Sequence, residues 1–324
     1  MKYNIKNEMI HKELRKFGVL VRTMSPYIKE STLHKCNWYF NKFMKGKWKS
    51  DKTDCINKEI VRVDGSKLRI LVITPKEKKK NVPGLLWIHG GGYELGVPEM
   101  TKGYMERFIL ESGCTIVSPD YRLSVEAPYP AALDDCYLAL KWLKEHAEEL
   151  GVRDDQLFVG GESAGGGLTV AVTLYARDKK EVAIAYQMPF YPMLDDRFIT
   201  KSSIDNDAPA WNTKSNEIAW KLYLGDLYKS DNVPMYAAPA RCTDYKGLPP
   251  TCTFIGTIEP FYDETVEYVK NLKKAGVKVH FKEFDGAYHA FDSFRPNAKI
   301  SCEAVEFYMD SFRYAVENYF AVQQ

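Results

Sequence analysis

The sequence predicts an α/β fold with a mostly parallel sheet that is covered by helices on both faces. Three observations lead to this prediction. Short apolar stretches alternate with helical patterns from residue 58 onward, a glycine-rich turn joins a strand to a helix, and 45% of the 324 residues are hydrophobic. Strands that alternate with helices favour parallel sheets, and this much apolar material is enough for one large core.

The predicted elements follow in a regular order. A hairpin is expected first, because residues 59–63 and 67–74 alternate around the turn pair Asp64-Gly65. Apolar runs predict the later strands, and periodic apolar patterns bounded by Pro and Gly predict the helices. The expected strands are 85–88, 115–118, 157–160, 182–188, 251–255 and 277–283, and the expected helices are 133–149, 165–176, 218–224, 263–275 and 300–320.

Two regions depart from this alternation. Residues 1 to about 55 lack strand character and carry apolar residues at helical spacing, so we expect at least two helices, separated at Pro26. Residues 197–235 are polar and rich in turns. We therefore expect an α/β catalytic domain formed by residues 56–196 and 236–324, an amino-terminal helical cap segment, 1–55, and a cap insertion, 197–235. The amino-terminal segment could instead only pack against the catalytic domain, without forming a lid over a pocket. Its attachment to a membrane surface is disfavoured.

Charge and composition argue against several classes of partner. The formal net charge of +2 gives no reason to expect nucleic acid or an anionic membrane as a partner. No apolar run is long enough for a signal-peptide core or a membrane span. Seven cysteines without a CxxC pair and six scattered histidines suggest reduced thiols and no metal cluster. We expect a cytoplasmic protein that acts on a small molecule without metal or cofactor. A homodimer stays open.

The strongest chemical motif is Gly161-Glu162-Ser163-Ala164-Gly165, which matches the nucleophile pattern GxSxG. An apolar strand precedes it and a helix follows, as this motif requires. The small residues permit a sharp turn, and a hydroxyl at a helix amino terminus faces free N–H groups. An incidental serine in a glycine-rich turn is the competing interpretation, which the strand–helix context argues against. We predict that Ser163 is a nucleophile.

A second glycine-rich loop, His89-Gly90-Gly91-Gly92, directly follows the strand expected at 85–88. Backbone N–H groups of such a loop can stabilise an oxyanion together with the N–H that follows the nucleophile. We predict Gly91, Gly92 and Ala164 as these donors, and His89 as a residue that holds the loop. A phosphate-binding loop is disfavoured, because the Lys-Ser/Thr ending and the GxGxxG spacing are missing.

A serine nucleophile needs a base and a carboxylate that orients it. His289 lies in a turn after the last expected strand, whereas His280 lies inside that strand, so we predict His289 as the base. Two acids follow the strand 251–255. Glu259, at the end of that strand, is favoured, and Asp263 is the alternative, although it could instead be the N-cap of the next helix.

These motifs together resemble the hormone-sensitive-lipase-like family of α/β-hydrolase esterases, from about residue 58 to the end of the chain. The resemblance implies an eight-stranded sheet, a helical cap built from the amino-terminal helices and the insertion, and hydrolysis of small acyl esters without a cofactor. At the acid, the family usually has Asp where this chain has Glu259, so the match favours an unusual Glu. The matching segments are 89–93, 120–123, Glu126, 128–135, 161–165, 191–196 and 288–291.

The sequence thus predicts a serine carboxylesterase for short acyl chains, and acetyl esters in particular. An amidase or peptidase with the same triad stays open, and a non-catalytic ligand receptor is disfavoured because the triad is complete. Aromatic residues of the expected cap segments could narrow the acyl pocket, although core packing is the alternative for most of them. They are Trp38, Phe40, Trp211 and Trp220.

Overall fold

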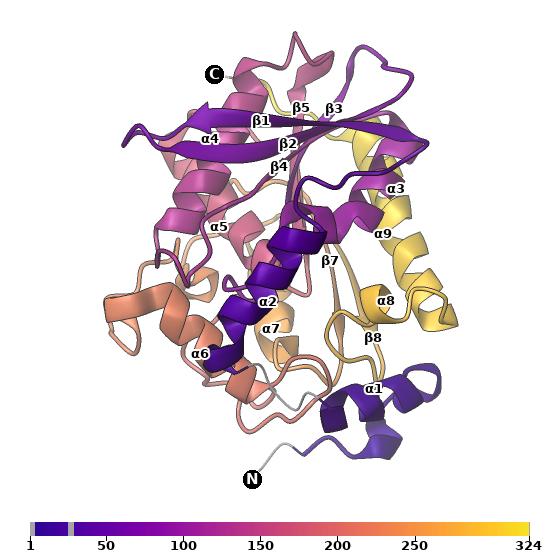
Figure 1. The fold of residues 1–324 in the computed structure, drawn as a ribbon, viewed down its shortest axis with the longest axis vertical. Helices are drawn as coiled ribbons and strands as arrows, with labels where there is room; N and C mark the ends of the chain where they lie inside the picture. The colour runs from indigo at the N-terminus through magenta and orange to yellow at the C-terminus, as the bar shows by residue number, and fades with distance from the viewer. Residues whose placement is uncertain (1–3, 25–28, 324) are drawn as a thin grey trace.

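An eight-stranded sheet lies at the centre of the computed structural model, which describes residues 4–24 and 29–323 (Figure 1). The strand order is β1-β2-β4-β3-β5-β6-β7-β8. Strands β3 to β8 run parallel, and β1 and β2 add an antiparallel edge. This confirms the predicted fold class. The strands are β1 Thr53–Val61, β2 Lys67–Pro75, β3 Val82–Ile88, β4 Thr115–Pro119, β5 Val152–Glu162, β6 Tyr186–Phe190, β7 Thr251–Gly256 and β8 Val279–Phe284.

Helices cover both faces of the sheet. Helix α3 packs against α9 on one face, and α4 packs against α5 on the other (Figure 1). Side chains of α5 and α7 share one buried apolar cluster, so α7 belongs to the second layer. The helices are α1 Lys12–Met24, α2 Glu30–Phe43, α3 Lys102–Ser112, α4 Ala131–Glu145, α5 Ala164–Lys179, α6 Thr213–Leu224, α7 Tyr262–Lys274, α8 Phe291–Phe294 and α9 Lys299–Asn318.

The predicted hairpin is present, and its register runs from Thr53 opposite Pro75 to Val61 opposite Lys67. The side chain of Asp64 accepts hydrogen bonds from the backbone N–H and the hydroxyl of Ser66, which closes the turn. Strand β1 begins at Thr53, within the segment that was expected to lack strands. Pairing with β2 along its whole length accounts for this earlier start.

Other boundaries also differ from the prediction. Helix α3 was not predicted, because its buried residues (Tyr104, Met105, Phe108 and Ile109) are interrupted by polar ones. Helix α6 starts at Thr213 rather than at residue 218, because the side chain of Asn212 accepts a hydrogen bond from Ser215 N and caps the helix. Helix α4 ends at Glu145 rather than at 149, and β6 begins at Tyr186 rather than at 182.

The two segments expected to form a cap supply helices α1, α2 and α6. Helices α2 and α6 are far apart in the sequence but lie side by side (Figure 1), and Lys221 Nζ is 3.9 Å from Glu30 Oε2 between them. The break predicted at Pro26 falls outside the described residues. Within residues 4–24 and 29–323, each helix is too short or too polar to cross a lipid bilayer.

Parallel strands bring the segments that follow them to one edge of the sheet. The glycine loop follows β3, Ser163 follows β5, Glu259 follows β7 and His289 follows β8. The topology therefore gathers all the predicted site residues at the carboxyl ends of the strands.

Candidate active site

The turn between β5 and α5 forces Ser163 into a strained backbone conformation. Its φ is 59° and its ψ is −122°, a region that few residues other than glycine occupy. A side chain at Gly165 would collide with the carbonyl oxygens of Ile88 and His89, so the loop and the turn pack backbone to backbone. This close approach places Ser163 at the amino terminus of α5, directly against the glycine-rich loop.

His289 lies between Ser163 and Glu259. Its Nε2 is 2.7 Å from Ser163 Oγ, and its Nδ1 is in hydrogen-bond contact with Glu259 Oε2. The other carboxylate oxygen of Glu259 accepts the N–H of Gly256, at 3.0 Å, which fixes the direction of the carboxylate. All three side chains are buried, with Ser163 6% and His289 5% exposed. The structure therefore brings the predicted nucleophile, base and favoured acid into one hydrogen-bonded chain.

Asp263, the alternative acid, has other partners. Its Oδ2 accepts the N–H of Ser202 at 2.8 Å, and its own N–H donates to Ser202 Oγ at 3.0 Å. It lies in the first turn of α7, whose N-cap position belongs to Phe261, so the proposed N-cap role is wrong. The carboxylate of Asp263 instead fastens the beginning of the 197–235 segment to α7.

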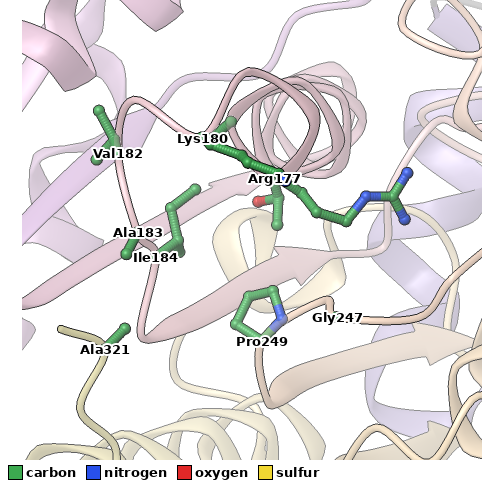
Figure 2. A pocket seen from close by; sticks show the side chains of 10 residues that line it. Arg177, Lys180, Val182, Ala183, Ile184, Gly247, Pro249 and Ala321 are labelled. Atoms are coloured by element: carbon green, nitrogen blue, oxygen red, sulfur yellow. The ribbon is translucent and has the colours of Figure 1, made fainter. Parts of the chain in front are cut away.

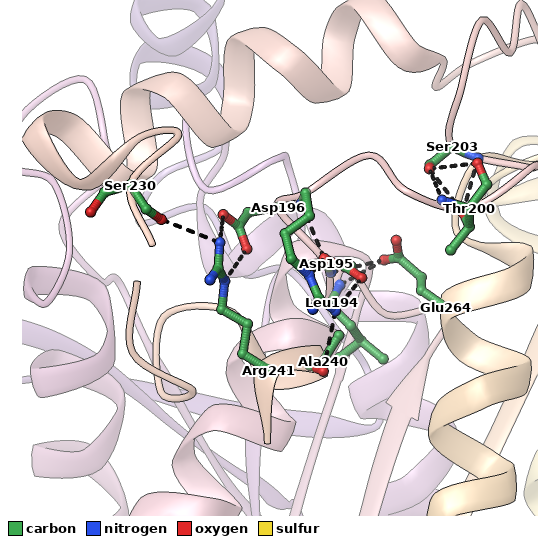
Figure 3. A network of polar contacts seen from close by, with 10 residues as sticks. Leu194, Asp195, Asp196, Thr200, Ser203, Ser230, Ala240, Arg241 and Glu264 are labelled. Atoms are coloured by element: carbon green, nitrogen blue, oxygen red, sulfur yellow. Dashed lines mark hydrogen bonds and ion pairs between the residues drawn. The ribbon is translucent and has the colours of Figure 1, made fainter. Parts of the chain in front are cut away.

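A wider polar network holds the same junction (Figure 3). Glu264 Oε1 accepts the N–H of Leu194 at 2.7 Å, which ties α7 to the chain that leaves β6. The Arg241 guanidinium binds both oxygens of Asp196, at 2.7 and 2.8 Å. These contacts fix both the start of the 197–235 segment and the helix that follows Glu259.

The glycine-rich loop exposes backbone donors beside Ser163. Gly91 and Gly92 have φ values of 112° and 63°, and a side chain on Gly91 would collide with the carbonyl oxygen of Leu95. Among the hydrogen bonds of the described residues, none is donated by the N–H of Gly91, Gly92 or Ala164. These three N–H groups, which the sequence predicts as oxyanion donors, therefore have no acceptor within the described chain.

His89 interacts with the loop itself and with Tyr121. Its Nδ1 donates to Gly90 O at 2.8 Å, its ring stacks on Tyr121 at 4.3 Å, and the Tyr121 hydroxyl donates to His89 O. Burial lowers the pKa of the His89 imidazole. His89 therefore holds the loop as a neutral ring. His280, inside β8, bonds through Nδ1 with Ser311 Oγ.

Glu162 is a site residue that sequence reasoning missed. Its Oε1 accepts the N–H of Gly90 at 2.6 Å, and its Oε2 has no hydrogen-bond partner in the described chain. Burial raises the pKa of Glu162 to about 8, so the side chain is mostly protonated at neutral pH. Its position at the end of an apolar strand, directly before Ser163, was the signal in the sequence.

An aromatic wall encloses His289. Tyr191 and Phe261 meet the imidazole edge to face, with ring centroids 5.0 and 5.1 Å away, and Trp211 lies 6.2 Å away. The Trp211 ring also lies so close to Gly92 that a side chain there would collide with it. Of the aromatic residues expected to narrow the pocket, Trp211 is the one beside the site, whereas Trp38 is 58% exposed.

A surface pocket of about 290 Å³ lies at the opposite edge of the sheet (Figure 2). Val182, Ala183 and Ile184 line it before β6 begins, and Gly247 and Pro249 line it before β7 begins. This pocket belongs to the amino ends of the strands and shares no residue with the site. No group of three His, Cys, Asp or Glu side chains in the described ranges is arranged to hold a metal ion.

Comparisons with known proteins relate this chain to a family and to several esterases. A model of the alpha/beta hydrolase fold family matches residues 85–293. Carboxylesterase NlhH of Mycobacterium tuberculosis is 31% identical over 77% of this chain and 79% of its own length. Ethyl acetate hydrolase of Pseudomonas putida is 27% identical over 75% of this chain and 77% of its own. A bacterial heroin esterase structure is 32% identical, covers 95% of this chain and 98% of its own, and has a TM-score of 0.87.

The family match spans more than half of the chain, and carboxylesterases are similar to it over most of its length. The motifs on which the resemblance to hormone-sensitive lipase rests lie within or beside the matched segment. The chain therefore belongs to the α/β-hydrolase family, in its hormone-sensitive-lipase-like branch, and is a serine carboxylesterase.

Proposed function

We propose that the enzyme hydrolyses esters of short acyl chains, acetyl esters above all, through a Ser163–His289–Glu259 triad and an acyl-enzyme intermediate. The hydrogen-bonded chain of these three side chains carries the proposal, because Ser163 Oγ is 2.7 Å from His289 Nε2. This is within the distance needed for direct proton transfer.

In this mechanism His289 Nε2 takes the proton of Ser163 as its Oγ attacks the ester carbonyl. The carbonyl oxygen becomes negative and accepts the N–H groups of Gly91, Gly92 and Ala164. His289 then protonates the leaving alcohol. A water molecule attacks the acyl-enzyme, again with His289 as the base. Glu259 holds the imidazole through Nδ1 and stabilises its positive charge.

The preference for short acyl chains is supported by the wall around the site. Trp211 lies against both His289 and Gly92, and Ser163 is only 6% exposed. A relative of this chain is named ethyl acetate hydrolase. Since each added methylene would have to displace part of this wall, chain length should affect the rate strongly.

A series of p-nitrophenyl esters from acetate to dodecanoate tests this preference. We expect kcat/KM to be highest for acetate or butyrate and at least about tenfold lower for octanoate, because a packed pocket rejects extra methylenes. Maximal activity on the longest chains would contradict the proposal. The p-nitroanilide of acetic acid, measured in parallel, should react far more slowly than the ester, and comparable rates would favour an amidase.

We also propose a reducing, cytoplasmic location, which the seven free cysteine thiols support. We further propose the division into a catalytic domain, an amino-terminal cap segment and a cap insertion.

We propose a small-molecule ester as the binding partner of the enzyme. Whether the enzyme forms a homodimer stays open.

A further inference from the structure

Glu94 follows the oxyanion loop, three residues after Gly91, and carries a carboxylate that the mechanism does not use. The backbone of Glu94 is fixed on both sides. Its N–H donates to Gly91 O at 3.1 Å, and its carbonyl accepts the Asn37 side-chain amide of α2 at 2.8 Å. These two contacts fix the backbone of Glu94 directly beside the loop that would bind the ester carbonyl.

The carboxylate of Glu94 has no hydrogen-bond partner among the described residues, although the residue is fully buried. This is unusual, because buried polar groups in native proteins are nearly always paired. No Lys, Arg or His within the described chain pairs with the carboxylate. Burial raises the pKa of Glu94 to about 8, and repulsion from the carboxylate of Glu30 on α2 contributes to this rise. Without a ligand, the group avoids the cost of burying a charge by staying protonated.

Other unpaired polar atoms lie on α6, which covers the same loop. Trp220 packs against Tyr93, the residue before Glu94, with ring centroids 5.6 Å apart, and its Nε1 has no partner among the described residues. The Asn216 Nδ2 is also unpaired, while the Oδ1 of the same residue accepts from Trp211. A buried region with several unpaired polar atoms beside the glycine-rich loop is typical of a place that a polar ligand completes.

We propose that Glu94 is a substrate-binding residue that selects esters carrying a protonated amine. This inference rests on the proposed function. Since the acyl part is proposed to be short, the amine belongs to the alcohol part. When it binds, Glu94 loses its proton to solvent, and the ammonium donates to the carboxylate, so that two charges are paired in a buried site. A cation is favoured over a neutral donor because the buried carboxylate of Glu94 has no Lys, Arg or His partner within the described chain.

The test uses two acetates of almost the same shape. In 2-(dimethylamino)ethyl acetate the amine is protonated at pH 7, and 3-methylbutyl acetate has a carbon in place of that nitrogen. We expect the wild type to have a kcat/KM at least about tenfold higher for the cationic ester, and Glu94→Gln to lose most of this preference, since the amide cannot pair with a charge. The ratio cancels any general effect of the substitution on folding or catalysis.

Glu30→Gln is the matched control, because it removes a nearby charge that is solvent-exposed. It should keep the wild-type ratio to within about twofold, as expected for a screened surface charge. A wild type with no preference for the cation, or a Glu94→Gln variant that keeps the preference, would overturn the inference. A protein that hydrolyses neither ester, nor p-nitrophenyl acetate, would instead contradict the proposed function.

Discussion

Two glutamates of the candidate site, Glu259 and Glu162, differ in the groups that they contact. Glu259 and Glu162 are both buried at the carboxyl ends of parallel strands. Glu259 contacts the imidazole of His289, which becomes positive during the proposed reaction, whereas Glu162 accepts a backbone N–H of the oxyanion loop. Burial raises the pKa of Glu162 to about 8. The comparison shows that the partner, rather than the depth of burial, determines whether a carboxylate can stabilise a charge or hold a loop.

Of the substitutions that test this comparison, the one at Glu259 should reduce kcat the most. Glu259→Gln removes the negative charge beside His289 and favours the wrong imidazole tautomer, so kcat on p-nitrophenyl acetate should fall by about 10³-fold or more. Asp263→Asn should change kcat by less than about tenfold, because Asp263 contacts Ser202 rather than His289. A greater loss from Asp263→Asn than from Glu259→Gln, with both variants folded by circular dichroism, would assign the acid to Asp263.

The second largest loss of kcat is expected in the glycine-rich loop, whose Gly90 N–H donates to Glu162. Gly91→Ala puts a methyl group against the carbonyl oxygen of Leu95 at a φ of 112°. The loop must then shift its N–H donors, and we expect kcat to fall by about 10²-fold, the loss typical of a missing oxyanion donor. Gly103→Ala is the matched control, because only Arg107 lies near its new methyl group, at 3.8 Å. Equal activity of the two variants would remove the loop from the mechanism.

Glu162 itself should show its protonation in the pH dependence of stability. The folded state favours the neutral acid, so its contribution is complete below the unfolded pKa of 4.5 and is lost as pH rises toward about 8. Glu162→Gln abolishes this loss. Relative to the wild type, the free energy of unfolding of the variant should therefore increase by up to about 4 kcal/mol between pH 5 and pH 8.

Urea unfolding at the two pH values measures this change. Glu148→Gln, at an exposed position, is the control and should show a much smaller change. If the difference between Glu162→Gln and the wild type is the same at pH 5 and pH 8, Glu162 is not held as a neutral acid.

The smallest effect is expected at the opposite edge of the sheet. Arg177 lines the pocket in Figure 2 and donates to the carbonyl oxygens of Asp244 and Lys246. Arg177→Ala should lower the free energy of unfolding by about 1 kcal/mol through these lost bonds, and leave kcat/KM on p-nitrophenyl acetate within about twofold. A tenfold change in kcat/KM would connect this pocket to the reaction.

The sequence was most informative where chemistry requires a local pattern. The GxSxG turn, the glycine loop and the late histidine each occupy a short segment, so the residues that meet around Ser163 could be named before their geometry was known. For the acid, the sequence favoured Glu259 but kept Asp263 as the alternative, because the two are only four residues apart and both follow β7. Their partners, His289 and Ser202, come from distant segments.

What the sequence did not show depends on long-range packing. Nothing local indicates that Trp211 lies against Gly92, because the two are brought together by the path of the 197–235 segment. The burial of Glu94 and Glu162 likewise depends on neighbours from other elements, such as α2 and β3.

Covalent labelling with a fluorophosphonate tests the central claim, that Ser163 is the nucleophile, most directly. Peptide mapping of the inactivated enzyme should place one adduct on Ser163, with loss of activity proportional to labelling. Ser163→Ala should take no label and lose about 10⁴-fold or more in kcat. An adduct on a different residue in fully inactivated enzyme, or a Ser163→Ala variant with near-wild-type activity, would contradict the account.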